Sequence, residues 1–82
     1  MPIFKMYIIY SELRDRYYIG STGNIETRLK THNEGNVKST KYGIPWILVY
    51  SEEFETKTYA LKREFQIKRK KSRKYIEWLI NK

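Results

Sequence analysis

The sequence predicts a small α/β domain of the α+β kind, in which three strands are flanked by helices. Runs of aromatic and β-branched residues alternate with segments of helical periodicity, in the order β-β-α-β-α-α. The length of 82 residues corresponds to one domain over residues 1–82. The chain has no cysteine, which excludes disulfides, thiolate metal sites and cysteine nucleophiles.

The first two strands are expected at Phe4 to Tyr10 and at Tyr17 to Ser21. Both segments are rich in aromatic and β-branched residues, and the polar residues 11–16 fit a hairpin connection between them. Gly20 interrupts the second strand. A glycine there marks either an ordinary turn between a strand and a helix or a place where another group approaches the backbone closely.

The first helix is expected from about residue 25 to residue 33. Ile25 and Leu29 lie four residues apart and give it an apolar face, while Arg28 and His32 share an adjacent edge at the same spacing. A helix that follows an open glycine and carries an arginine suits a bound anion.

The third strand, Trp46 to Phe54, is the clearest strand in the sequence. Its continuous apolar centre predicts a middle position in the sheet. The segment before it, residues 37–45, is expected to be a loop and contains two cations, Lys38 and Lys41.

Two more helices are expected in the last third of the chain. One runs from Thr56 or Thr58 to about Lys70, and the other begins after Ser72. The candidate caps of the first helix are Ser21, Thr22 and Asn24. The residues predicted to form the apolar face of the last helix are Tyr75, Ile76, Trp78 and Leu79.

Positive charge is concentrated in residues 57–74. This segment holds nine of the 17 basic residues and one of the nine acidic residues, so it accounts for the whole net charge of +8. Such a segment indicates a nucleic-acid partner, or alternatively a solvated helix face; a membrane surface is disfavoured because aliphatic residues are sparse. The residues predicted to contact nucleic acid are Gly20, Lys38, Lys41, Lys62, Arg63, Lys68, Arg69, Lys70, Lys71 and Arg73.

Glu64 is the only acid in this basic segment, and it stands where the apolar stripe of Ala60, Leu61 and Ile67 should continue. An inward carboxylate is costly unless it is paired or coordinates a metal. Lys68, four residues further on, offers an ion pair. The other interpretation is a site where cations gather phosphate and the carboxylate holds a divalent metal.

Several separated positions resemble the GIY-YIG endonuclease superfamily. They are Met6-Tyr7, Tyr18-Ile19-Gly20, Arg28 eight residues past the glycine, His32 four further on, and Ala60-x-x-x-Glu64. The resemblance extends from about Phe4 to Trp78. It is closest to the short, single-domain bacterial members related to the nuclease domain of the excision-repair endonuclease.

This resemblance implies a three-stranded antiparallel sheet and a metal-dependent endonuclease, expected to act on DNA and to select structure rather than sequence. It implies Glu64 as the ligand of Mg²⁺ or Mn²⁺ and Arg28 as the cation that stabilises the scissile phosphate. It implies Tyr7 as the phenol that assists the attacking water, with Tyr18 positioning or sharing that role. His32 is the rival base, because an unperturbed imidazole titrates near neutral pH.

Without the resemblance, Tyr7 and Tyr18 would be interpreted as core aromatic residues and His32 as a structural residue. The sequence departs from the family at Lys5-Met6-Tyr7, where the glycine and isoleucine of the motif are replaced. Asn81 is the only candidate for the amide that many relatives place late in the domain.

Two other functions stay open at this point. One is a non-catalytic module that binds nucleic acid with the same fold, and the other is an adaptor that binds protein through aromatic residues. Their binding should differ in salt dependence, because phosphate contacts release counterions. A protein partner for targeting is a further expectation. No membrane span or signal peptide is visible, so we expect a cytoplasmic protein.

Overall fold

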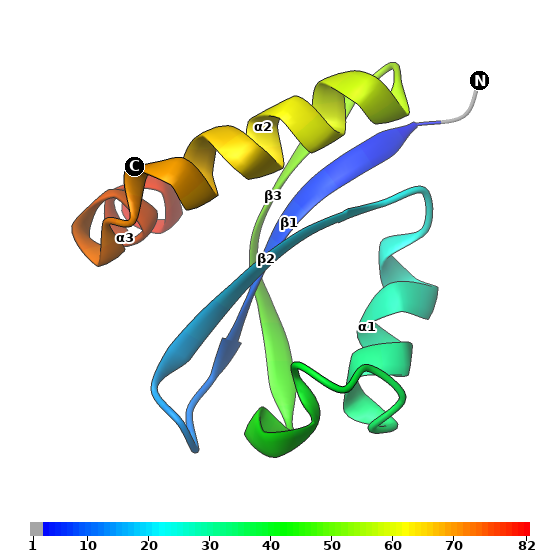
Figure 1. Cartoon of the computed structure of the whole chain (residues 1–82), viewed down its shortest axis with the longest axis vertical. Coiled ribbons are helices and arrows are strands. Elements are labelled where there is room, and N and C mark those ends of the chain that lie inside the picture. The colour runs from blue at the N-terminus through cyan, green and yellow to red at the C-terminus, as the bar shows by residue number, and fades with distance from the viewer. Residues whose placement is uncertain (1–2) are drawn as a thin grey trace.

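The computed structural model describes residues 3–82 and confirms the predicted order of strands and helices (Figure 1). The elements in chain order are β1 (Phe4–Ser11), β2 (Arg16–Thr22), α1 (Ile25–Asn33), the 3-10 helix η1 (Lys41–Gly43), β3 (Trp46–Phe54), α2 (Lys57–Lys70) and α3 (Arg73–Asn81). The short helix η1 lies inside the segment that the sequence predicted as a loop.

The three strands form one antiparallel sheet in the order β2-β1-β3. β1 is therefore the central strand, and the predicted middle position of β3 is wrong. The apolar run of β3 was misleading because Trp46 and Val49 pack against opposite cores, while Ile47 and Leu48 between them are 54% and 40% exposed. A run of apolar residues thus occurs here on an edge strand.

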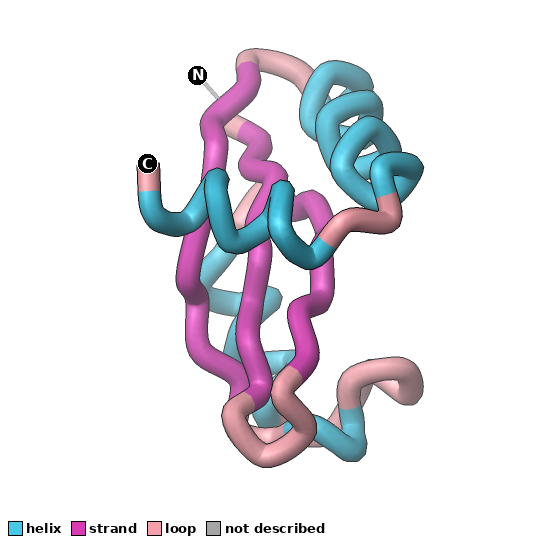
Figure 2. Tube along the Cα trace, turned by 90° about the vertical axis from the view of Figure 1, so that its left-hand side faces the viewer, coloured by secondary structure: helices cyan, strands magenta, loops and turns pink. Residues whose placement is uncertain are grey.

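Helices cover both faces of the sheet, α1 on one face and α2 with α3 on the other (Figure 1). Figure 2 shows α3 lying across the near face of the sheet, with α1 behind it. The side chains of β1 alternate between these layers. Met6 and Ile8 belong to the core under α2 and α3, whereas Tyr7 and Ile9 face α1. The central strand therefore presents Tyr7 to the α1 layer.

Each α-helix begins at a capping side chain. The caps are Asn24, Thr56 and Ser72, and each accepts a hydrogen bond at 3.1 Å from the backbone N–H three residues further on. The other candidates, Ser21, Thr22 and Thr58, lie inside β2 or α2. Asn24 starts α1 directly after the end of β2, which places Arg28 close to that strand.

One member of the predicted apolar face of α3 does not face the core. Leu79 is buried and Tyr75 and Ile76 pack against the core, but Trp78 is 58% exposed. The Trp78 ring instead stacks on the Tyr75 ring, with 5.8 Å between their centroids, and the ammonium of Lys82 lies 5.4 Å from the Trp78 centroid. Local stacking therefore accounts for a tryptophan that helical periodicity assigned to the core.

Within residues 3–82, every helix is too short or too polar to cross a lipid bilayer.

The edge position of β3 can be tested by substitution. We expect Leu48→Lys to cost less than about 1 kcal/mol of unfolding free energy, because the side chain is partly exposed and lysine is tolerated on edge strands. Ile9 is the cross-strand neighbour of Leu48 and is fully buried, so Ile9→Ala should cost about 2–5 kcal/mol. Urea denaturation measures both values, and similar losses in the two variants would contradict the strand order.

Candidate active site

The site is built around the phenol of Tyr7, which lies against Gly20 of the neighbouring strand. The two residues are paired across β1 and β2, and Tyr7 is only 1% exposed. A Cβ atom added to Gly20 would lie 2.5 Å from the phenol oxygen, a distance that no real contact permits. The expectation of a close approach at Gly20 is confirmed, and the approaching group is the Tyr7 phenol.

A directed chain of hydrogen bonds leads from this phenol into the protein. The Tyr7 hydroxyl lies 2.8 Å from His32 Nε2, and His32 Nδ1 lies 2.8 Å from the Thr40 hydroxyl. Because the Thr40 hydroxyl donates its proton to the Val37 carbonyl, Nδ1 of His32 must carry the hydrogen that Thr40 accepts. Nε2 then accepts from Tyr7. The chain fixes the tautomer of His32 as a neutral acceptor that faces the phenol.

Charge and burial set the protonation of these groups. Burial raises the pKa of Tyr7, and the adjacent Arg28 guanidinium offsets part of this rise. Hydrogen bonding to Tyr7 raises the pKa of Arg28, which also interacts with the phenol of Tyr18. Burial, and to a smaller extent the charge of Arg28, lowers the pKa of His32. At neutral pH Tyr7 is therefore a neutral phenol and His32 a neutral imidazole.

Tyr18 joins the same cluster from β2. Its ring meets the His32 ring edge to face, with 5.1 Å between the centroids. The ammonium of Lys68 lies 5.8 Å from the centroid of the Tyr18 ring. Tyr18 thus lies between the imidazole on the α1 side and a cation that comes from α2.

Glu64 approaches β2 from α2, which covers the opposite face of the sheet. One carboxylate oxygen accepts a hydrogen bond from the Ser21 hydroxyl at 2.8 Å, and the other is paired with the Lys68 ammonium at 2.7 Å. The alternative of an ion pair with Lys68 is therefore present in the structure. Glu64 also lies near enough to Tyr7 for its charge to contribute to the raised pKa of the phenol. The acid, the guanidinium and the two phenols converge at the β2 edge of the sheet.

A hollow of about 270 Å³ opens beside this cluster. The residues that line it are Phe4, Ser21, Thr22, Gly23, Arg28, Lys57 and Ala60. A water occupies about 30 Å³ of the liquid, so the hollow has room for a phosphate group and several waters. Two cations, Arg28 and Lys57, face into it, and this charge suits an anion.

The residues present fit a hydrated divalent cation held by a single protein carboxylate. No cluster of three or more histidine or acidic side chains occurs within residues 3–82, so Glu64 is the ligand that the site offers. Mg²⁺ commonly takes one or two carboxylates and completes its shell with waters and phosphate oxygens. The Lys68 ammonium now contacts the oxygen that such a cation would share.

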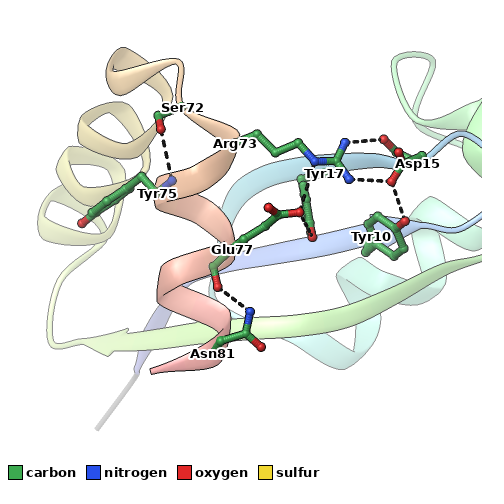
Figure 3. A network of polar contacts seen from close by, with 8 residues as sticks. All are labelled: Tyr10, Asp15, Tyr17, Ser72, Arg73, Tyr75, Glu77 and Asn81. Carbon is green, nitrogen blue, oxygen red and sulfur yellow. Dashed lines mark hydrogen bonds and ion pairs between the residues drawn. The ribbon is translucent and has the colours of Figure 1, made fainter.

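The other predicted nucleic-acid contacts fall into separate groups. Arg63 is bound to Glu52 through two nitrogens, at 2.8 and 3.1 Å, and Arg73 is bound to Asp15 (Figure 3). Lys62, Arg69 and Lys70 line a different hollow, together with Tyr59 and Phe65. Lys38 and Lys41 lie exposed in the segment that follows α1, and the Gly20 backbone lies under Tyr7. Asn81 donates to the Glu77 carbonyl within α3.

Two polar residues of the site were missed by the sequence analysis. Thr40 orients His32, and Ser21 holds Glu64. Ser21 could have been found, because it directly follows the Gly20 position and alternation turns it to the α2 face. Thr40 carries no local signal, since it reaches His32 from an irregular segment.

Comparison with known proteins agrees with this geometry. The model of the GIY-YIG catalytic domain matches residues 4–76. The chain therefore belongs to the GIY-YIG family, and through it to a superfamily of nucleases.

Its relatives include short proteins named UPF0213. A UPF0213 protein of Staphylococcus haemolyticus is 42% identical over 66 residues, which cover 78% of this chain and 80% of the relative. A UPF0213 protein of Streptococcus pneumoniae is 39% identical over 77 residues, with 92% of this chain and 78% of the relative covered. The solution structure of UPF0213 protein BH0048 from Bacillus halodurans has a TM-score of 0.60 and 29% identity, and the match covers 96% of this chain and 83% of that one.

Gly20→Ala tests the close approach of Tyr7 to β2. The new methyl group would overlap the phenol, so we expect a loss of about 1–3 kcal/mol of unfolding free energy and displacement of Tyr7 from His32. Urea denaturation and the NMR signals of the single histidine measure the two effects. Gly23→Ala is the matched control, because its Cβ would meet Phe4 at an ordinary 3.4 Å. Equal behaviour of the two variants would contradict the close approach.

The lowered pKa of His32 predicts how stability depends on pH. The unfolded chain takes up a proton on this imidazole at a higher pH than the folded chain, so stability falls as the pH drops below the unperturbed value of 6.5. His32 is the only histidine, and the carboxylates titrate at lower pH. Urea denaturation between about pH 7.5 and pH 5.5 should show this loss, and the slope should flatten in His32→Gln. An unchanged slope in the variant would contradict the assignment.

Proposed function

We propose that this chain is a metal-dependent endonuclease that hydrolyses a phosphodiester bond of nucleic acid, with DNA as the expected substrate. The observation that carries the proposal is the convergence on the Tyr7 phenol: His32 accepts its hydrogen bond, Arg28 lies beside it and Glu64 acts on it through its charge. These are one base, one guanidinium and one carboxylate around a single hydroxyl. Membership of the GIY-YIG family supports the reaction class.

The protonation of the pair indicates how Tyr7 and His32 divide the work. A phenol whose pKa is raised by burial does not stay ionised at neutral pH, so it needs an acceptor at the moment of attack. His32 is that acceptor. In the proposed step the attacking water gives a proton to the Tyr7 oxygen while the Tyr7 proton passes to His32 Nε2. The two residues act in series and are not rivals.

Arg28 and Tyr18 would serve the phosphate. The Arg28 guanidinium faces the hollow beside Ser21 and is fixed by its contact with Tyr7, so it can donate to phosphate oxygens as negative charge develops. The cation that Glu64 would hold, Mg²⁺ or Mn²⁺, supplies Lewis-acid polarisation of the scissile phosphate when bound. Tyr18, packed against His32, would orient the imidazole and its surroundings.

The alternative function is a nucleic-acid-binding module without catalysis. A specific observation favours it: Glu64 is 9% exposed with both oxygens hydrogen-bonded, and Tyr7 and His32 are almost fully buried. Lys68 must leave Glu64 before a metal can bind, and Tyr7 must gain access to water. The binding-only alternative predicts that neither change occurs.

Glu64→Gln separates these two functions. We expect metal-dependent cleavage to fall by at least about 100-fold, because a metal contributes several kcal/mol of transition-state stabilisation. Binding of a labelled DNA in the presence of a chelator should persist and stay salt-sensitive. The measurement is cleavage of single-stranded, nicked, branched and duplex DNA with Mg²⁺, Mn²⁺ or chelator. Glu55→Gln, on an exposed residue before α2, is the matched control. Absence of cleavage by the unaltered protein on every substrate would favour the binding module.

A further inference from the structure

A second hollow, of about 590 Å³, lies along β2 on the far side of Glu64 from Arg28. We call it the edge hollow. Its floor is formed by Tyr17, Ile19, Ile67 and Ile76, and its rim by Arg14, Asp15, Arg16, Lys68, Lys71, Ser72 and Arg73. Five cations therefore surround an apolar floor with a single carboxylate among them. Lys68 joins this rim to the candidate active site, since its ammonium contacts Glu64.

The walls of the edge hollow are tied together across the sheet. Arg73 at the start of α3 reaches the turn between β1 and β2, where it binds the carboxylate and the carbonyl of Asp15 (Figure 3). Tyr10 donates to the same carboxylate, and these two contacts lower the pKa of Asp15. The one acid of the rim is thus engaged. Arg16 and Lys71 form no ion pair with any described residue.

The backbone at two rim positions is unusual. Asp15 at φ 52° and Lys71 at φ 48° are the non-glycine residues with positive φ in the described part of the chain. Lys71 occupies the left-handed position that ends α2, where glycine is the favoured residue. A lysine there strains the backbone, and residues in strained conformations are concentrated at functional sites. The strain places an additional cation at the rim.

We propose that the sugar-phosphate backbone of the bound nucleic acid runs along the β2 edge and through the edge hollow, with Arg16 and Lys71 contacting phosphates that flank the reacting one. This inference rests on the proposed function, because it takes the phosphate at Glu64 as the starting point. Arg16 precedes Ser21 by five residues, which is roughly 16 Å along a strand. At 3.4 Å per nucleotide of a B-form strand, this length spans about five nucleotides.

Charge and position favour this path over the outer face of α2. That face exposes Tyr59 and Phe65 among Lys62, Arg69 and Lys70, but Glu64 points inward from the opposite side of the helix. A helix with its side chains is about 10–12 Å across, so a backbone lying on the outer face is held away from the carboxylate. The edge hollow adjoins Glu64 directly through Lys68.

Two double variants of equal charge test the path. Arg16→Gln/Lys71→Gln removes two cations from the edge hollow, and Lys62→Gln/Arg69→Gln removes two from the outer face of α2. Affinity for a short fluorescein-labelled DNA is measured by anisotropy with chelator present, over about 50–200 mM salt. In the edge variant the slope of log K against log salt should fall by about 1.4–1.8, for two lost phosphate contacts. The outer-face variant should keep the slope of the unaltered protein.

Lys71→Gly adds a test in which stability and binding move in opposite directions. Relief of the left-handed strain should raise the Tm by roughly 4–8 °C, while the lost cation weakens DNA binding and lowers the salt slope by about 0.7–0.9. A purely structural role for Lys71 predicts unchanged binding, which would overturn the proposal.

The remaining outcomes are also decisive. Equal losses in the two double variants indicate diffuse attraction, and a loss confined to the outer-face variant indicates the other path; both overturn this inference while DNA cleavage by the unaltered protein still supports the proposed function. Edge-dependent binding without any cleavage supports the path and removes the nuclease. If the unaltered protein binds an acidic peptide but no DNA, both proposals fail.

Discussion

The arrangement of the site depends on one close approach, that of the Tyr7 phenol to the backbone of Gly20. Tyr7 lies on the central strand, where neighbours on both sides fix its position. The space left by the missing side chain of Gly20 directs the phenol toward the β2 edge. His32, Arg28 and Glu64 then reach the same hydroxyl from helices on opposite faces of the sheet. A larger residue at position 20 would leave the fold possible but the convergence lost.

This constraint explains why a small protein buries so many polar groups. Thr40 and His32 together with Tyr7 occupy a part of the interior that apolar residues would fill with less risk, since an unpaired polar group in a core costs about 1–3 kcal/mol. Each of them is satisfied, and no buried side-chain nitrogen or oxygen of the described residues lacks a partner. A fully paired network of this kind specifies one geometry. The groups are neutral because burial sets their protonation.

The sequence predicted those features that depend on neighbouring residues. The caps Thr56 and Ser72, the hairpin and the close approach at Gly20 follow from local chemistry, and the GIY-YIG resemblance identified the residues that converge. The strand order did not follow, because pairing partners are chosen by contacts between distant segments. Thr40 was missed for the same reason. Its role exists only because the segment after α1 folds back onto His32.

The concentration of positive charge in residues 57–74 has a different meaning in three dimensions than along the chain. Arg63 is used to hold Glu52 and thereby join α2 to β3, and Arg73 joins α3 to the first hairpin. Lys68 neutralises Glu64. These three cations stabilise the fold or the resting site, so the segment is not simply a footprint of nucleic acid. The net charge of +8 still attracts a polyanion from a distance. Where that polyanion settles is decided by the few cations that lie next to the carboxylate.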